Sequence, residues 1–432
     1  MAMPKSRDVA RKLDVYMHGR VVGVFEQDDS GQLGFQYAKS WLAGPSRLPL
    51  SQSLPLRSQA FDNREARPFF AGLLPEGEKR DLVARALGVS ARNDFALLDG
   101  IGGECAGAIT FVEHGATPSS TTTAADYRPL DDEQIAKLLD KLPERPLLAG
   151  EEGVRLSLAG AQDKLPVLVV DGKVALPLHG APSSHILKPP IPHFDDTVHN
   201  EGFCLALAKA LGLHVINSEI GSAKGKTFLL VERYDRHRDA AGTIIRRHQE
   251  DLCQALGIPP ELKYQAEGGP SLQQCFDVVR RSTTRPVIDL ARLLDAVLFN
   301  LLSGNNDAHG KNYSLLFGPN GVELAPIYDV LSTAAYQDLA PRLAMKIDDR
   351  YEFADLFPRH WDRFAKEAGL GAPQLRRRLI ALARRLPDAA RQLRGQFVDA
   401  GLDRPVIGRI LAVMDERTRM VLKRFETEPR KT

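Results

Sequence analysis

The segment Asn306–Asn312 holds the residues best suited to chemistry. Asp307 stands five residues before Asn312, which is the spacing between the catalytic Asp and the metal-binding Asn of protein kinases. In phosphoryl transfer a carboxylate orients the attacking hydroxyl, while an amide oxygen and a second carboxylate hold Mg²⁺. The spacing therefore predicts a kinase-like reaction with Asp307 as the base and Asn312 as a metal ligand.

The second metal carboxylate is expected further along the chain. The apolar run Leu293–Leu302 predicts a helix, so Asp307 should lie on the loop that follows it. Two short strands are expected at Tyr313–Phe317 and Val322–Ala325, and Asp329 comes directly after them. A loop after a helix, then a hairpin, then an aspartate is the order expected for a kinase site, so Asp329 is the predicted second Mg²⁺ ligand.

The phosphate-binding groups are expected upstream. Lys188 ends the apolar strand His185–Lys188, where an ammonium group would neutralise phosphate charge. The segment Ser157–Lys164 is rich in small residues that allow backbone N–H groups to approach phosphate. Val231–Arg236 follows another expected strand and fits a hinge for adenine.

Each of these residues also has a structural interpretation. Asp307, Ser157 and Gly160 could simply be turn residues. His309 could be a hydrogen-bonded core histidine. Lys188 could be a solvated strand end, and Asp329 could cap a helix. An Asp five residues before an Asn is common when taken alone. The functional interpretation is favoured by the order of the motifs, which runs glycine-containing loop, lysine, hinge, Asp-x4-Asn and aspartate.

The elements that must position these residues change in type along the chain. A β-hairpin is expected over residues 13–38, from the runs Leu13–Phe25 and Leu33–Tyr37. A linker is expected at 114–126 because this stretch is rich in Gly, Ser, Thr and Ala. Strands are expected at 164–170, 173–178, 185–188 and 227–232, with helices at 69–74, 78–87, 131–141, 200–211, 249–256, 271–281, 287–303, 359–369, 373–385 and 404–426. Strands followed by helices predict an α+β fold.

The composition limits the class of protein. The chain has 432 residues, of which 43% are hydrophobic and 26% charged, with a net charge of +2. This balance argues against a protein that mainly wraps nucleic acid. No cysteine pair has metal-ligand spacing, and neither a signal peptide nor an apolar run long enough to cross a membrane is visible, so reduced thiols in a cytoplasmic protein are expected.

The motifs together resemble those of HipA, the serine/threonine kinase toxin family of HipBA toxin–antitoxin modules. The matching segments are Leu73–Gly77, Asp94–Ala108, Ser157–Lys164, His185–Pro189, Val231–Arg236, Gln249–Gln254, Asn306–Asn312 and Tyr328–Asp329. Departures are small: Ala308 and Gly310 are exchanged relative to a common family form, and the hinge has Tyr234 where Phe also occurs. The resemblance covers nearly the whole chain.

The resemblance implies a kinase-like two-lobed fold, with a mixed α/β N-terminal part and an all-helical C-terminal lobe. The implied domains are an N-terminal domain at 1–115, a linker and helix at 116–150, and a kinase domain at 151–432 whose strand-rich ATP-binding part ends at about 236. ATP and Mg²⁺ are the implied cofactors. Asp307 would be the base and Asn312 and Asp329 the Mg²⁺ ligands, and the implied ATP-binding residues are Ala159, Gly160, Ala161, Gln162, Lys188, Glu232, Tyr234, His309 and Lys311.

The resemblance also implies regulation and partners. Ser157 matches an autophosphorylated serine, and Arg233 matches the arginine that receives the phosphoserine. Implied partners are a HipB-like helix-turn-helix antitoxin, operator DNA reached mainly through that antitoxin, and a substrate such as glutamyl-tRNA synthetase or another aminoacyl-tRNA synthetase. A small-molecule or lipid-type kinase and a non-catalytic co-repressor stay open as alternatives. Residues 359–394 hold ten Lys/Arg against three acids, and this surface could face DNA, RNA or only solvent.

Overall fold

The computed structural model describes residues 11–45, 47–118 and 122–426. They form two compact units. Unit 1 takes the described residues up to 184 together with 235–250 and 257–261, and unit 2 takes 185–234, 251–256 and the described residues from 262 onward. The start of the chain, and part of the linker expected at 114–126, lie outside the described residues.

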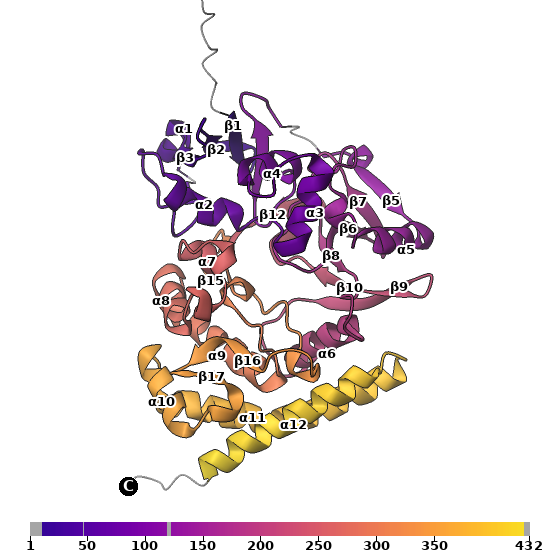
Figure 1. Cartoon of the computed structure of the whole chain (residues 1–432), viewed down its shortest axis with the longest axis vertical. Coiled ribbons are helices and arrows are strands. Elements are labelled where there is room, and N and C mark those ends of the chain that lie inside the picture. Colours follow the sequence, from indigo (N-terminus) through magenta and orange to yellow (C-terminus); the bar gives the residue numbers. More distant parts are fainter. Residues whose placement is uncertain (1–10, 46, 119–121, 427–432) are drawn as a thin grey trace, which may run out of the picture. The chain divides into compact units, whose positions relative to one another are not determined.

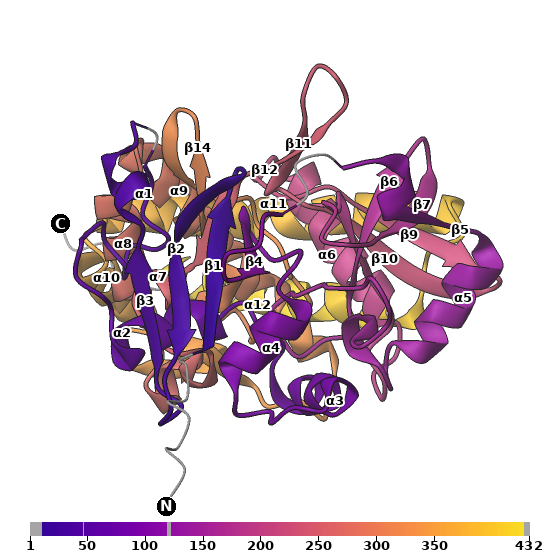
Figure 2. The same cartoon turned by 90° about the horizontal axis from the view of Figure 1, so that it is seen from above.

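The first sheet of unit 1 is antiparallel with the order β3-β2-β1-β4 (Figure 2). Its strands are β1 (Arg11–Met17), β2 (Arg20–Gln27), β3 (Leu33–Tyr37) and β4 (Ile109–Glu113). The prediction of one continuous run over Leu13–Phe25 was wrong. The backbone turns at His18 and Gly19, which both have positive φ angles, and apolar residues on both sides of this tight turn hid it in the sequence.

A cluster of phenylalanines joins this sheet to its helices. Phe25 of β2 stacks on Phe70 with ring centroids 4.2 Å apart, and Phe95 lies 5.4 Å from Phe25. The alternation of β2 and the helical spacing of the next segments thus bury their aromatic residues in one core. The helices of unit 1 are α1 (Lys39–Ala43), α2 (Asn63–Ala71), α3 (Gly77–Leu87), α4 (Asp94–Ile101) and α5 (Asp132–Lys141).

The remaining strands of unit 1 pair in antiparallel fashion. The strong turn signal at Asp171–Gly172 is confirmed, because both residues have positive φ angles between paired strands. Gly88 is confirmed as the left-handed C-cap of α3. These strands are β5 (Tyr127–Leu130), β6 (Leu165–Val170), β7 (Lys173–Pro177), β11 (Arg236–Arg238) and β12 (Ile244–Arg246).

Unit 2 opens with an antiparallel set of strands in which β10 pairs with both β8 and β9. These are β8 (His185–Lys188), β9 (Ser218–Ala223) and β10 (Lys226–Glu232); later strands are β14 (Ser314–Gly318), β15 (Gly321–Leu324), β16 (Arg342–Ile347) and β17 (Arg350–Glu352). Strands β9, β16 and β17 were not predicted from the sequence. The helix expected at 249–256 was partly wrong, since β13 (His248–Asp251) is a strand and only α7 (Leu252–Ala255) is helical.

The other helices of unit 2 follow the predicted order, and α11 and α12 lie side by side as two long antiparallel rods (Figure 1). They are α6 (Thr197–Ala210), α8 (Leu272–Ser282), α9 (Pro286–Ser303), α10 (Pro358–Glu367), α11 (Ala372–Asp399) and α12 (Pro405–Glu426). The predicted helix at 373–385 was too short, because α11 continues through Pro387. The α+β expectation is confirmed. The expectation of an all-helical C-terminal lobe was wrong, because strands β14 to β17 lie among its helices.

Half of the basic residues in the stretch 359–394 pair with acids inside unit 2. The arginines in printed ion pairs are Arg363 with Asp348, Arg376 with Asp362, Arg378 with Asp295, Arg391 with Asp388 and Asp415, and Arg394 with Asp403. Much of this charge therefore holds helices together. Among the described residues no helix is long and apolar enough to cross a membrane, and all four cysteines are buried and free, as expected for reduced thiols.

Candidate active site

The Asp307 loop begins where α9 ends. Gly304 caps α9 with a φ of +86°, and a Cβ there would lie 2.7 Å from Ser332 Oγ and 2.8 Å from Val413 Cγ1. Only glycine suits this left-handed, crowded position. Beyond it, Asp307 N–H donates to Asn305 Oδ1 at 3.1 Å, and His309 N–H donates to Asp307 O at 2.8 Å. The loop is thus folded by its own polar groups, and Asp307 is left exposed at its tip.

Asn306, the residue before Asp307, is anchored from three directions. Asn306 N–H donates to Thr333 Oγ1 at 2.9 Å, and Asn306 O accepts from Ala344 N–H of β16 at 2.7 Å. The Asn306 side chain accepts from Arg417 of α12 at 2.9 Å, and Arg417 also donates to Leu301 O. A buried guanidinium in the last helix therefore ties the loop to the rest of unit 2.

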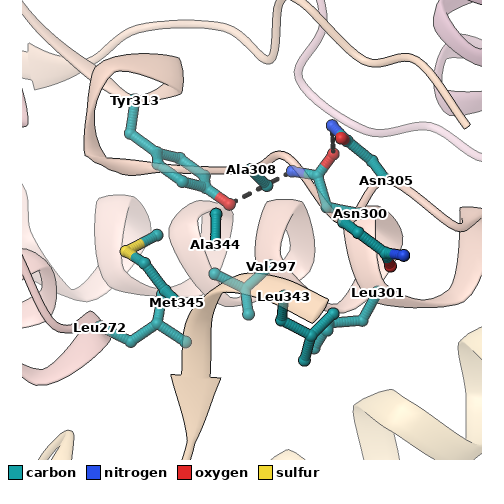
Figure 3. A pocket seen from close by; sticks show the side chains of 11 residues that line it. Leu272, Val297, Asn300, Leu301, Asn305, Ala308, Tyr313, Leu343, Ala344 and Met345 are labelled. Carbon is teal, nitrogen blue, oxygen red and sulfur yellow. Dashed lines mark hydrogen bonds between the residues drawn. The ribbon is translucent and has the colours of Figure 1, made fainter. Parts of the chain in front are cut away.

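A small pocket beneath the loop shows how it is supported (Figure 3). Asn300 of α9 donates to the Tyr313 hydroxyl at 3.2 Å and accepts from Asn305 at 2.9 Å. Ala308 and Met345 contribute apolar lining. Because Asn300 links the residues on both sides of Asp307, it fixes the width of the loop.

A chain of charges links the predicted lysine to the predicted metal ligands. Lys188 Nζ lies 2.6 Å from Glu201 Oε1 and 2.9 Å from Asp329 Oδ1. Asn312 Nδ2 donates to the other Asp329 oxygen at 2.8 Å. Asp329 has a φ of +56°, an unfavourable conformation for a non-glycine residue of the kind that gathers at functional sites. Unit 2 thus brings together Lys188, Asn312 and Asp329 from distant parts of the sequence.

Glu201 is the functional candidate that the sequence reasoning missed. It lies on α6 and is almost fully buried beside Lys188. Burial opposes the charge on Lys188, but the carboxylates of Asp329 and Glu201 outweigh that effect and raise the pKa of Lys188 above its ordinary value. The lysine is therefore cationic at neutral pH. A signal was available, because Glu201 is the only acid within the expected helix 200–211.

Replacing Glu201 with glutamine should weaken the interaction that Lys188 is expected to make with the ATP phosphates, without unfolding unit 2. Hydrogen bonds to charged groups contribute about 1.5–3 kcal/mol, so we expect a roughly 10–100-fold loss in kcat/KM for ATP. Steady-state kinetics at varied ATP would measure it. Glu219→Gln on the neighbouring strand β9 is the control, and an equal effect of the two substitutions would contradict the assignment.

The donor set at Asp329 and Asn312 fits Mg²⁺. Both side chains carry oxygen donors of the type that Mg²⁺ prefers, and the Asp329 side chain is 44% exposed, so an ion can reach it. Asn312 Oδ1 accepts from His309 N–H at 3.0 Å while the amide nitrogen faces Asp329, so this amide would have to turn to offer its oxygen to the ion. A second acidic group, formed by Asp348, Asp349 and His360, does not fit a metal. His360 Nδ1 accepts from Phe357 N–H at 2.9 Å, which places the ring hydrogen of the neutral imidazole on Nε2 and removes that ligand.

Lys311 and His309 are turned into the loop's interior. Lys311 is buried and lies 3.2 Å from Asp251 Oδ2, while its carbonyl oxygen accepts from the Tyr328 hydroxyl at 2.7 Å. His309 is buried, and its ring meets that of Tyr264 edge to face at 5.4 Å. In this structure both side chains therefore make contacts that hold the loop's shape.

The predicted hinge residues lie at the end of β10. Glu232 is exposed and its N–H donates to Asn217 O at 2.9 Å, while its carboxylate accepts from Asn217 at 2.7 Å. Arg233 is buried. The Tyr234 ring lies 5.4 Å from that of Tyr328, the residue before Asp329. Burial raises the pKa of Tyr328, with the neighbouring Tyr234 adding to the effect.

The glycine-containing loop belongs to unit 1 and is anchored there. Ser157 is fully buried; its hydroxyl donates to Leu73 O at 2.8 Å and its N–H to Glu104 O at 2.9 Å. Gly160, with a φ of +107°, accepts from Glu76 N–H at 3.1 Å. Lys164 Nζ donates to Ala159 O at 2.6 Å, whereas Ala161 is exposed and Gln162 partly so. Two of the sequence motifs, 73–77 and 157–164, thus pack on each other.

Comparisons with known proteins agree with these motifs. The HipA-like C-terminal domain model matches residues 156–390, and the HipA N-terminal domain model matches residues 13–112. A putative kinase, Y4mE, from Sinorhizobium fredii is 49% identical over 95% of this chain and 98% of its own length. The serine/threonine-protein kinase toxin HipA of Shewanella oneidensis is 34% identical over 87% of this chain and 88% of its own length.

A solved structure resembles the whole chain. The complex of Shewanella oneidensis HipA with HipB and operator DNA contains a chain that matches 96% of this one and 100% of its own length. The TM-score is 0.82 and the sequence identity is 30%, which supports the expected kinase-like fold. With both family models, these relatives and this structural match in agreement, the chain belongs to the HipA family of kinases.

Proposed function

We propose that this chain is an ATP-dependent serine/threonine protein kinase. The observation that carries the proposal is the connected set Glu201–Lys188–Asp329–Asn312 on the same unit as the exposed Asp307. A non-catalytic relative would be expected to lack the base or a metal ligand, and this chain has every one of them. Kinases depend on a Lys–Glu ion pair and on an aspartate that holds Mg²⁺. Lys188 with Glu201 would supply the ion pair, and Asp329 would supply the aspartate.

Each residue has a defined task in the proposed reaction. Asp307 accepts the proton of a Ser or Thr hydroxyl as its oxygen attacks the γ-phosphorus of ATP. The bond from that phosphorus to the β-phosphate oxygen breaks, and ADP leaves. Lys188 neutralises phosphate charge, and Asn312 and Asp329 would hold Mg²⁺, which supplies further charge stabilisation when bound. Ala159–Gln162 of unit 1 would bind the phosphates through backbone groups. Glu232 and Tyr234, which belong to unit 2, would bind adenine through their backbone groups.

The family relationship extends the proposal to a toxin–antitoxin system. The Shewanella oneidensis relatives are a HipA toxin and a HipA in complex with HipB and operator DNA. We therefore propose a HipB-like helix-turn-helix antitoxin as the partner, with which this chain would act as co-repressor of its operon. The proposed substrate is a translation protein such as glutamyl-tRNA synthetase, so the enzyme would act in the cytoplasm.

Autophosphorylation at Ser157 would switch the kinase off. A phosphate adds about −1.5 to −2 charges at pH 7, and the Ser157 hydroxyl has no exposure and donates to a backbone carbonyl. A dianion cannot stay beside Leu73 O, so phosphorylation would expel the loop from its place in unit 1. Arg233 would then receive the phosphoserine as a charge-assisted pair.

The test is to map phosphorylated peptides after incubation with Mg-ATP. Ser157 should carry phosphate in the native chain, and Ser157→Ala should carry none at this site while it phosphorylates an added protein substrate for longer. Ser184→Ala is a matched control in the same unit. Phosphate at other sites but never at 157 would overturn the autophosphorylation claim, and phosphorylation of a lipid or small molecule alone would favour the small-molecule kinase.

A further inference from the structure

Tyr264 contacts the proposed base directly. Its hydroxyl donates a hydrogen bond of 2.9 Å to Asp307 Oδ1. The two residues lie 43 positions apart in the sequence, on different loops of unit 2. A carboxylate oxygen accepts hydrogen bonds, so this contact fixes the direction of one of the two Asp307 oxygens.

The position of the Tyr264 ring is fixed by its own loop. Tyr264 O accepts from Glu267 N–H and Gly269 N–H, each at 2.9 Å, which closes a tight turn. A Cβ on Gly269 would lie 2.3 Å from Leu262 O, so the turn excludes larger residues. On the other side the ring packs edge to face against His309 at 5.4 Å. The tyrosine is therefore held from two directions.

Strand β16 anchors both partners of this contact. Ala344 N–H donates to Asn306 O at 2.7 Å, next to Asp307, and Lys346 N–H donates to Gln265 Oε1 at 2.9 Å, next to Tyr264. The two loops are thus hydrogen-bonded to residues two apart on one strand. Since strands are stiff over that length, the distance between the Tyr264 hydroxyl and Asp307 is set by β16.

From these contacts we infer that Tyr264 is a positioning residue for the proposed kinase reaction. Its hydroxyl holds the rotation of the Asp307 carboxylate relative to the acceptor hydroxyl of the proposed substrate. Asp307 is exposed, and loss of this donor would widen the range of rotamers that its side chain adopts. Orienting a base in this way raises the rate of the chemical step and does not alter nucleotide binding. The inference rests on the proposed function.

Two other roles for the same contact predict different results. If the ring served only packing against His309, removal of its hydroxyl would leave the rate unchanged. If the hydroxyl occupied the place of the substrate and blocked it, removal would raise the rate and lower the KM for the protein substrate. The positioning role predicts a lower kcat with the KM for ATP unchanged.

The experiment measures phosphate transfer from Mg-ATP by the full chain and by Tyr264→Phe, at varied ATP concentration. Tyr351→Phe, on strand β17 of the same unit, is the matched control. A lost hydrogen bond to a charged group corresponds to a roughly 10–100-fold change, so kcat should fall by that factor in Tyr264→Phe alone. The KM for ATP and the thermal midpoint should stay at their native values.

The possible outcomes separate the inference from the function on which it rests. An inactive native chain that binds Mg-ATP would overturn both. An active native chain with an unchanged or faster Tyr264→Phe variant would overturn the positioning role and leave the kinase intact. A fall in kcat accompanied by an equal fall in Tyr351→Phe, or by a shifted thermal midpoint, would also overturn it, because the effect would then be structural.

Discussion

Replacing Asp307 with asparagine should lower the rate of phosphoryl transfer by ~10²–10⁴-fold, the contribution typical of a positioned general base. Asparagine keeps the shape of the side chain and can still accept from Tyr264 through its carbonyl oxygen. It cannot accept the proton of the attacking hydroxyl. The backbone contacts of the loop, which run through Asn305, Asn306 and His309, are unaffected, so the variant should fold and bind Mg-ATP as the native chain does.

The comparison needs a variant that changes an exposed acid elsewhere in unit 2. Asp338→Asn serves, because Asp338 is exposed in the segment before β16 and none of the contacts described above involves it. Quenched-flow measurement of the first turnover isolates the chemical step from product release. A rate for Asp307→Asn within threefold of the control's, with equal nucleotide binding, is incompatible with Asp307 as the base.

Replacing Glu104 with alanine should destabilise unit 1 by about 3–5 kcal/mol, the loss expected when one partner of a buried ion network is removed. Glu104 has no exposed surface. Its carboxylate accepts from Arg236 at 2.8 Å, from Arg246 at 2.6 Å and from Ser183 Oγ at 2.9 Å. Removal leaves Arg236, whose side chain is 1% exposed, as a buried cation with one fewer carboxylate to neutralise it.

The control for this loss of stability is an ion pair between a glutamate and a basic residue at the surface. Glu133 and Lys137 are both well exposed and pair at 2.8 Å on α5, and such pairs contribute about 0.3–0.5 kcal/mol. Urea titrations should therefore show a large fall in the midpoint for Glu104→Ala and almost none for Glu133→Ala. Similar midpoints in the two variants would show that the buried network is not what joins residues 235–250 to unit 1.

Local signals in the sequence were enough to predict the loop that carries Asp307 and the elements around it. The Asp307–Asn312 spacing, the apolar run of α9 and the turn before β15 are all features of consecutive residues, and the structure places each as expected. Lys188 was also predicted from a local pattern, an apolar strand ending in a lysine. The structure adds that Lys188 contacts Asp329, 141 positions away.

The missing parts of the site depend on contacts between distant residues. Nothing near Glu201 in the sequence says that α6 faces Lys188, and nothing near Tyr264 says that its loop reaches Asp307. Both pairs arise from tertiary packing, which periodicity and spacing do not encode. The hydrogen bond from the Ser157 hydroxyl to Leu73 O also joins distant residues. The sequence assigned the motif around Leu73 to the N-terminal region but did not show that it contacts Ser157.

Two errors in the fold concern the places where elements begin and end. His18–Gly19 divides a run that appeared continuous, and His248–Asp251 is extended although its composition suits a helix. In the second case the side chain of Asp251 caps α7 by accepting from Gln254 N–H at 2.9 Å, so the helix begins only after it. Tertiary context thus decided where each element starts.

The central claim is that this chain transfers the γ-phosphate of ATP to protein hydroxyls through Asp307. The most direct test is intact-mass and peptide mass spectrometry after incubation of the purified chain with Mg-ATP and a bacterial protein extract, in parallel with Asp307→Asn. The account predicts phosphorylated serine or threonine in the chain or the extract with the native protein and none above background with the variant. Equal phosphorylation by both proteins, or none by a native chain that binds Mg-ATP, would contradict it.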